Sequence, residues 1–217
     1  LTASQGQGAD VAESMEETSW SLQEAMRTPA FWRLLFAFSI VQLAIASLGL
    51  HRIPSFVDRG LDAQLVAYAT ALDAVASGVS SLLTGFLVDR FQVRFLGGAA
   101  FALLGVAIWL TIIANSPLLL FLAMGTFGIG IGGFRLLQSY LWADYFGRHF
   151  LGSIRGFVAP IQLISGIGGP VFAALVYDFR ESYSMAFSTF VVAYVLGALL
   201  ILATRPPVPP QAEPVSA

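Results

Sequence analysis

The stretch PLLLFLAMGTFGIGIGGFRLLQ, residues 117–138, contains one charged side chain, Arg135, among 22 residues. A helix of about 20 predominantly apolar residues crosses the hydrocarbon core of a bilayer, because each residue adds about 1.5 Å. A soluble domain does not require an apolar run of this length with so little polar surface. The stretch therefore predicts a transmembrane helix.

Five further runs of similar length and character accompany it. They cover residues 30–50, 63–87, 95–115, 154–177 and 184–204, and short charged or proline-bearing breaks separate them. The mean hydropathy of the chain is +0.77 and 11% of its residues are charged, whereas soluble globular domains have about 25% charged residues. The sequence thus predicts an all-α, polytopic membrane protein with a domain of six transmembrane helices over residues 30–204.

The composition excludes several classes of function. The formal charge is −2 and the arginines are scattered singly, so there is no basic patch for nucleic acid. Cysteine and lysine are absent, which removes disulfides, thiolate metal sites and Schiff-base chemistry. His51 and His149 lie in different breaks, and no catalytic triad, carboxylate pair or metal-ligand cluster accompanies them. We expect neither an enzyme nor a bound cofactor or metal ion.

The two ends of the chain are predicted to lie outside the membrane. Residues 1–29 read as a polar linker, in which Ser21 and Glu24 have the S-x-x-E spacing of a capping box and predict a short helix on the membrane surface. Residues 205–217 are rich in proline and predict an extended tail.

The distribution of arginine predicts the orientation, because arginine is more frequent on the cytoplasmic side of membrane spans. With the N-terminus inside, three arginines fall on the outer side, and the cytoplasmic side holds seven: Arg27, Arg33, Arg90, Arg94, Arg148, Arg155 and Arg205. We therefore expect a multi-pass protein of the cell membrane with both termini in the cytoplasm.

The break between the second and third runs carries the most specific motif. Residues 85–94 read GFLVDRFQVR, in which Gly85 precedes Asp89 by four residues, and Arg90 and Arg94 follow. This pattern resembles the G-x-x-x-D-R-x-x-x-R loop of the major facilitator superfamily. HRIP at 51–54, DRGL at 58–61 and ADYFGR at 143–148 resemble the corresponding connections of its monocarboxylate-porter-like members.

The resemblance implies a twelve-helix transporter made of two six-helix halves. This chain is similar to the second half, so its expected partner is the missing N-terminal half. Halves of this kind consist of two inverted three-helix repeats, and the substrate site lies between the halves near the middle of the membrane. The resemblance assigns Gly85, Asp89, Arg90 and Arg94 to the loop motif involved in conformational change.

Two charged residues inside the predicted spans are the candidate site residues. Asp73 lies in the second span on a polar stripe that also includes Ser77, and Arg135 lies in the fourth span one turn from Gln138. A charge at such a depth costs at least about 2.5–3.5 kcal/mol unless it has a partner or water. We expect Arg135, Gln138 and Ser77 to contact substrate and Asp73 to carry the coupled proton.

The relation between Asp73 and Arg135 stays open at this point, because their backbones differ by about 10 Å in height along the helices. Either a substrate carboxylate bridges them, or Arg135 extends toward the cytoplasm while the hydroxyl groups of the stripe hold Asp73. The resemblance is also incomplete. Monocarboxylate-porter-like relatives commonly carry an Asp and an Arg at the positions of Ser77 and Ser81.

The sequence leads to two hypotheses of function. The first is a secondary active transporter, a symporter in which an organic anion such as a monocarboxylate and a proton cross the membrane by alternating access. The second is a membrane sensor or assembly subunit that has the same half-fold and does not transport.

Overall fold

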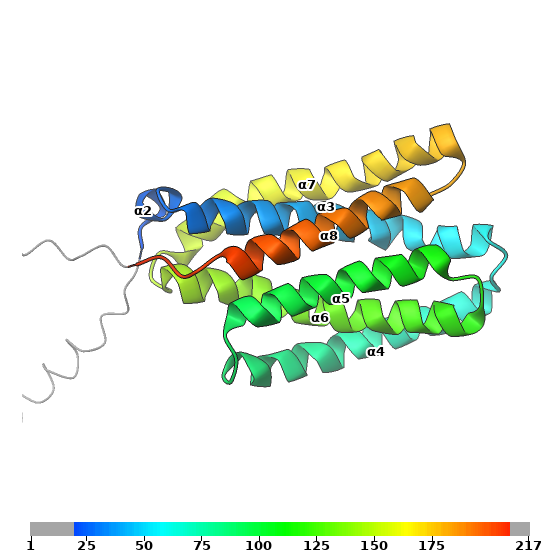
Figure 1. Ribbon diagram of the computed structural model, residues 1–217, viewed down its shortest axis with the longest axis horizontal. Helices are drawn as coiled ribbons and strands as arrows, with labels where there is room; N and C mark the ends of the chain where they lie inside the picture. The colour runs from blue at the N-terminus through cyan, green and yellow to red at the C-terminus, as the bar shows by residue number, and fades with distance from the viewer. Residues whose placement is uncertain (1–19, 209–217) are drawn as a thin grey trace, which may run out of the picture.

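The structure, a computed structural model, describes residues 20–208, so most of the expected linker and tail lies outside the described residues. This part of the chain is all-helical (Figure 1). Its helices are α2 (Leu22–Met26), α3 (Pro29–Asp58), α4 (Ala63–Val88), α5 (Val93–Ile113), α6 (Pro117–Phe146), α7 (Leu151–Arg180) and α8 (Ser184–Ala203). The helices α3 to α8 are long and apolar enough to cross a membrane, which confirms the six predicted spans.

Side chains at the first residues explain where several helices begin. Thr28 and Ser116 accept a hydrogen bond from the backbone at α3 and α6, and a proline follows each of them at the first helical position, where its missing N–H costs nothing. Asp62 caps α4 in the same way. The capping box of Ser21 and Glu24 forms as predicted and begins α2.

Three helices extend well beyond the apolar runs that predicted them. α3 continues from residue 50 to Asp58, α6 continues from residue 138 to Phe146, and α7 begins at Leu151. Helical hydrogen bonds are satisfied within the backbone, so a helix does not need to end where its side chains become polar. The HRIP segment at 51–54 consequently lies inside α3 and not in a loop.

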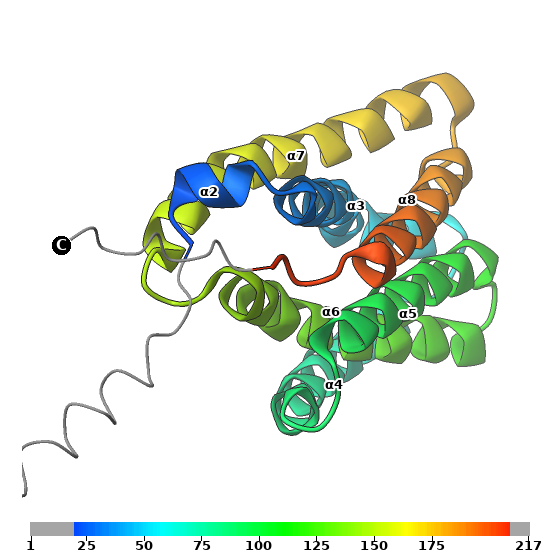
Figure 2. The same cartoon turned by 60° about the vertical axis from the view of Figure 1, so that its left-hand side comes forward.

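The six long helices follow one another in space in the order α7, α3, α8, α5, α6, α4, which forms an open arc in Figure 2. Exchanging α3 with α6, α4 with α7 and α5 with α8 leaves this order of neighbours unchanged. The chain therefore contains two triplets, α3–α5 and α6–α8, with equivalent packing. This is the inverted-repeat arrangement that the sequence showed only as equal hydropathy.

Glycine allows the closest approaches between helices. A Cβ atom at Gly128 would collide with the carbonyl oxygen of Asp73, and one at Gly132 would collide with that of Ser77, so α4 and α6 meet backbone to backbone. On the other side of the arc, Gly169 of α7 meets the carbonyl oxygen of Leu43 in α3 in the same way. These contacts fix α4 on α6 and α7 on α3.

The two ends of the bundle have different surroundings. We call the end with Trp20, the 89–92 connection and Arg205 the base, and the end with the 59–62 and 181–183 connections the far end.

Between α4 and α6 on one side and α3 and α7 on the other, the helices make few contacts. This boundary, here called the seam, is the open side of the arc in Figure 2.

Candidate functional site

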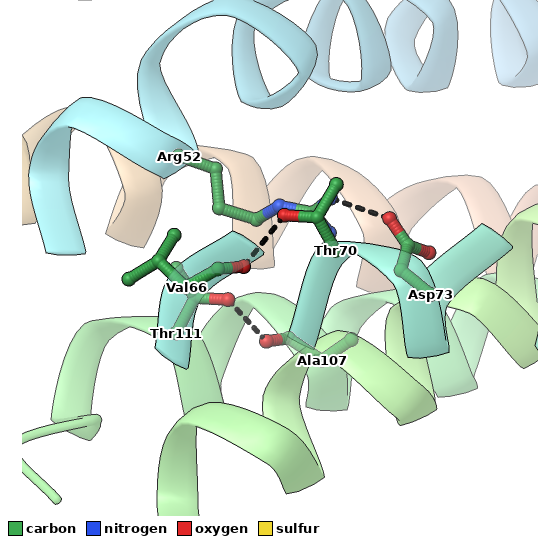
Figure 3. A network of polar contacts seen from close by, with 6 residues as sticks. All are labelled: Arg52, Val66, Thr70, Asp73, Ala107 and Thr111. Carbon is green, nitrogen blue, oxygen red and sulfur yellow. Dashed lines mark hydrogen bonds and ion pairs between the residues drawn. The ribbon is translucent and has the colours of Figure 1, made fainter. Parts of the chain in front are cut away.

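An ion pair crosses the seam between α3 and α4 (Figure 3). One terminal nitrogen of Arg52, Nη2, lies 2.6 Å from Oδ2 of Asp73. The Arg52 side chain is 6% exposed and that of Asp73 is 15% exposed. No other ion pair occurs within residues 20–208, so the charge predicted to be costly at Asp73 is balanced by a single buried arginine.

The surroundings of Arg52 are aromatic and incompletely hydrogen-bonded. The guanidinium lies 4.1 Å from the ring centroid of Phe127 in α6, which is within the range of a cation–π interaction. Nε and Nη1 of Arg52, Oδ1 of Asp73 and the hydroxyl of Tyr194 are all buried and have no hydrogen-bond partner among the described residues. A buried polar atom without a partner is costly, so this cluster has unused capacity for water, a proton or a ligand.

Local structure brings the pair together. Because α3 is helical as far as Asp58, Arg52 lies about 9 Å from the far end of its helix, and Asp73 lies about 15 Å from the start of α4. The long arginine side chain spans the difference of about 6 Å. Gly128 permits the close approach at Asp73, since a Cβ there would also lie 2.9 Å from Oδ1 of that carboxylate.

The hydroxyl groups of the polar stripe do not hold Asp73. Thr70 donates a 2.8 Å hydrogen bond to the carbonyl of Val66 in its own helix, as Figure 3 shows. Ser80 donates a 2.6 Å hydrogen bond to the carbonyl of Ile129 in α6. Both interpretations of Asp73 from the sequence therefore missed its partner, which is Arg52 and neither Arg135 nor a serine or threonine.

A cavity of about 970 Å³ opens at the base of the bundle. Arg135 is exposed on α6 and lines it together with Ser81 of α4 and Arg148 of the connection between α6 and α7. Within residues 20–208 Arg135 makes no hydrogen bond or ion pair to another side chain. An arginine with free donors can hold a carboxylate by two parallel hydrogen bonds.

Polar contacts also cross the seam near this cavity, between α6 and α7. Nε2 of Gln138 donates a 2.9 Å hydrogen bond to Oε1 of Gln162. Arg155 donates a 2.9 Å hydrogen bond to the carbonyl of Ser139. Nε2 of Gln162 is buried and has no partner among the described residues. This crossing therefore also contains a hydrogen-bond donor that is available to water or a ligand.

The loop motif at the base is largely solvated. Asp89 ends α4 and is exposed, and neither it nor Arg90 forms an ion pair in the described part of the chain. Arg94 donates a 3.1 Å hydrogen bond from Nε to Oε1 of Gln92. The nearest side-chain atom to a Cβ built at Gly85 is in Leu136, at 3.8 Å, so this glycine lies at an ordinary packing distance from α6.

The far end contains a second aromatic and polar cluster. His51 lies inside α3, where Nδ1 is 3.3 Å from the hydroxyl of Tyr183 and Nε2 is 3.2 Å from the carbonyl oxygen of Pro170 in α7. The rings of Tyr183 and Tyr177 stack with centroids 4.4 Å apart. Burial, and then the neighbouring Tyr177, Asp58 and Asp178, raise the pKa of Tyr183 above its ordinary value, so its hydroxyl remains a hydrogen-bond donor at neutral pH.

The residues predicted from the sequence thus fall at three places. Asp73 belongs to the buried ion pair, Arg135 belongs to the base cavity, and Gln138 belongs to the α6–α7 crossing. Ser77 lies one turn from Asp73 toward Ser81, on the α4 face that leads from the pair to the cavity, and its backbone packs on Gly132. Sequence reasoning missed Arg52, Tyr194, Phe127 and Gln162 as members of these sites.

A signal for Arg52 exists in the sequence. Asp73 is the only charged residue in the second apolar run, and Arg52 lies on the other side of the 59–62 connection, somewhat nearer to it than Asp73. Two antiparallel helices joined by a short turn bring such positions close together. The assignment of HRIP to a loop concealed this pairing.

Comparison with known proteins identifies the family. The profile of the Major Facilitator Superfamily matches residues 34–217. The chain belongs to this superfamily. It is a multi-pass membrane protein with the helical fold described above.

A human relative supports the monocarboxylate-porter-like resemblance. Monocarboxylate transporter 7 of Homo sapiens is 27% identical over an alignment of 161 positions, and the alignment covers 72% of this chain and 31% of that protein. The chain therefore spans less than two thirds of the length of this relative.

Proposed function

We propose that this superfamily chain forms one half of a secondary active transporter for a small organic anion, and that a monocarboxylate is its substrate class. The observation that carries the proposal is Arg135, an arginine inside a membrane-spanning helix that lines a cavity of about 970 Å³ and has no anionic partner among the described residues. The length of the cited relative supports a partner half, which in this reading supplies the opposite wall of the pathway.

In this proposal the base cavity is the cytoplasmic entrance of the pathway. The base carries most of the arginines outside the spans, which favours a cytoplasmic location for it in the cell membrane. Arg135 binds the substrate carboxylate by two hydrogen bonds. Ser81 of α4 lines the same cavity, and Gln138 lies one turn further along α6, where its amide donates to Gln162. Ser77 and Asp73 continue the same face of α4 deeper into the bundle.

Proton coupling is assigned to Asp73. In the structure its carboxylate balances the charge of Arg52, and Oδ1 is free to accept a proton. A proton on Asp73 leaves Arg52 with one uncompensated positive charge in a buried site. A substrate carboxylate bound at Arg135 adds one negative charge in turn, so a proton and an anion enter together and the net charge of the site is the same when it is loaded and when it is empty. Alternating access then carries the proton and the anion across the membrane together.

Uptake of labelled monocarboxylates by the protein at its full natural length tests the proposal. Arg135→Lys keeps the charge and loses the bidentate geometry, so it raises the apparent KM, and Arg135→Ala nearly abolishes transport. Arg33→Gln, which changes an exposed arginine at the start of α3, is the matched control. Normal kinetics in both Arg135 variants, at unchanged membrane insertion, refute the assignment.

Asp73→Asn tests the coupling separately. The amide cannot carry the proton, so accumulation driven by a pH gradient is lost while exchange of substrate down its gradient continues. An Asn variant that still accumulates substrate after an imposed pH step places the coupling residue elsewhere. A wild-type protein that transports no anion under either condition favours the sensor or assembly-subunit hypothesis.

A further inference from the structure

The three helices α4, α5 and α6 border an apolar fissure of about 500 Å³ that is open on its outer side, where side chains of α4 such as Val75 and Leu83 are exposed. Its walls are aliphatic side chains of α4 and α5, and its floor is α6, with Ile129, Gly133 and Leu137 spaced one turn apart. The two hydroxyl residues in it, Ser80 and Thr84, are buried, and Ser80 already donates its hydrogen to the Ile129 carbonyl. The fissure is therefore dry in character, because water inside it would find almost no polar partner.

A polar hollow of about 560 Å³ lies next to the fissure at the base, since Val88 in its wall follows Leu87 of the fissure. The α6 residues that form its floor, Tyr140 and Asp144, follow Leu137 on the same helical face at spacings of three and four. Arg94 and Arg205 line this hollow. One elongated site thus has an apolar shaft inside the membrane spans and a basic mouth at the membrane surface.

The dimensions of the shaft select its occupant. It extends along α4 from Leu72 to Leu87, a length of about 22 Å at 1.5 Å per residue. A volume of about 500 Å³ spread over this length makes the shaft narrower than a helix with its side chains, which is about 10–12 Å across. An extended hydrocarbon chain fits such a channel, whereas another helix does not enter it.

The charge of the mouth selects the head group. Two arginines face a single carboxylate there, and Arg94 uses only its Nε, toward Gln92. Its two terminal nitrogens have no partner within residues 20–208. Arginines grouped between membrane helices at the membrane surface bind anionic lipid head groups through charge-assisted hydrogen bonds.

We propose that this site binds an anionic glycerophospholipid, with one acyl chain in the α4–α5–α6 fissure and the phosphate at Arg94 and Arg205. The bound lipid fills the space between α4 and α5, which have few contacts of their own. The lipid therefore joins α4, which lies at one end of the arc, to α5. The site lies on a different face of α4 from Ser77 and Ser81, and it does not depend on the proposed transport.

Lipid retention and thermal stability test the proposal on the full-length protein, purified in mild detergent and stripped of lipid. Phosphatidylglycerol is the anionic probe, and phosphatidylcholine with the same acyl chains is the zwitterionic probe. Native mass spectrometry counts the lipids retained, and the apparent Tm is measured as each lipid is added. Both lipids present a phosphate to the two arginines, but phosphatidylcholine also brings its choline cation next to them, which offsets the charge-assisted contacts; we therefore expect a preference for phosphatidylglycerol of at least about tenfold.

Matched variants separate the two parts of the site. Ala99→Phe obstructs the shaft, whereas Ala102→Phe places the same side chain at an exposed position of α5 outside it. Arg94→Gln with Arg205→Gln neutralises the mouth, and Arg33→Gln removes an arginine from elsewhere on the base. We expect the Ala99 and the double arginine variants to lose the retained lipid and its Tm gain, and both controls to keep them.

Three results overturn the proposal. They are an absence of retained lipid in the unmodified protein, equal binding of the two lipids, and unchanged phosphatidylglycerol binding in Ala99→Phe. Ala99→Leu, a smaller change on the same wall, replaces Ala99→Phe if the latter fails to insert. Cross-linking of a cysteine at position 99 to another segment of the protein, at the expense of lipid, shows that protein covers the fissure.

Discussion

Replacing Asp73 by leucine removes the carboxylate that neutralises Arg52. Across the 2.6 Å contact the gross attraction is about 6 kcal/mol at an effective dielectric constant of 20. Desolvation of both charges offsets much of it, so the pair itself contributes little net stability. The stranded arginine is the main cost, and breaking one side of a buried pair costs about 3–5 kcal/mol.

The reverse change, Arg52→Met, is predicted to cost less, and its cost depends on pH. Arginine stays protonated at any accessible pH and cannot relieve its own burial. A buried carboxyl left without a cation neutralises itself by binding a proton. Lowering the pH from about 8 to about 5 therefore restores stability to Arg52→Met and does not help Asp73→Leu.

Apparent Tm values of the two single variants and the double variant, measured in detergent at one scan rate and at both pH values, check this asymmetry. For a chain of this size, 3–5 kcal/mol corresponds to a fall in Tm on the order of 10 °C. The double variant keeps no charge and is expected within a few degrees of the unmodified protein. Equal, pH-independent losses in the single variants that add up in the double variant would refute the reasoning.

Two further predictions concern packing and topology. Gly132→Ala drives a methyl group into the backbone of Ser77 and lowers the Tm by several degrees. Gly78→Ala, at an α4 glycine with open space around it, leaves the Tm unchanged or slightly raised. Equal effects of the two variants on the Tm would show that α4 and α6 separate freely. Asn115→Cys introduces a thiol at an exposed position of the far end, and this thiol reacts with an impermeant reagent added to intact cells. Gln92→Cys introduces a thiol at an exposed position of the base, and this thiol does not react. The opposite labelling would reverse the proposed orientation.

The six spans were predictable because hydrocarbon imposes a length and a composition that are readable in any window of about 20 residues. The capping box at Ser21 and Glu24 was equally readable, since it depends on two residues three positions apart. The ends of the helices were less predictable from the sequence. Hydropathy reports where side chains become polar, and α3 continues as a helix for eight residues beyond that point, as far as Asp58.

The candidate site was predicted only in part, because partners depend on how helices rotate against one another. The cost of burying charge identified Asp73 as a residue that needs a partner. The identity of that partner depended on the extension of α3 and on Gly128, which lets α6 approach the α4 backbone. Tyr194 gave no signal, since a tyrosine near the middle of an apolar run is unremarkable until its hydroxyl is found buried without a partner.

The seam between the triplets has a consequence for how water enters the bundle. Opposite the seam, α5 and α8 meet through apolar side chains, and prising them apart would wet hydrocarbon. Across the seam the contacts named above are an ion pair and hydrogen bonds, held by Arg52 and Asp73 toward the far end and by Gln138 and Gln162 toward the base. Hydration can replace such contacts at little cost. We therefore expect thermal fluctuations to separate the two triplets at the seam, with the contact between α5 and α8 as the hinge, and the first water molecules to reach the bundle interior beside the charged pair.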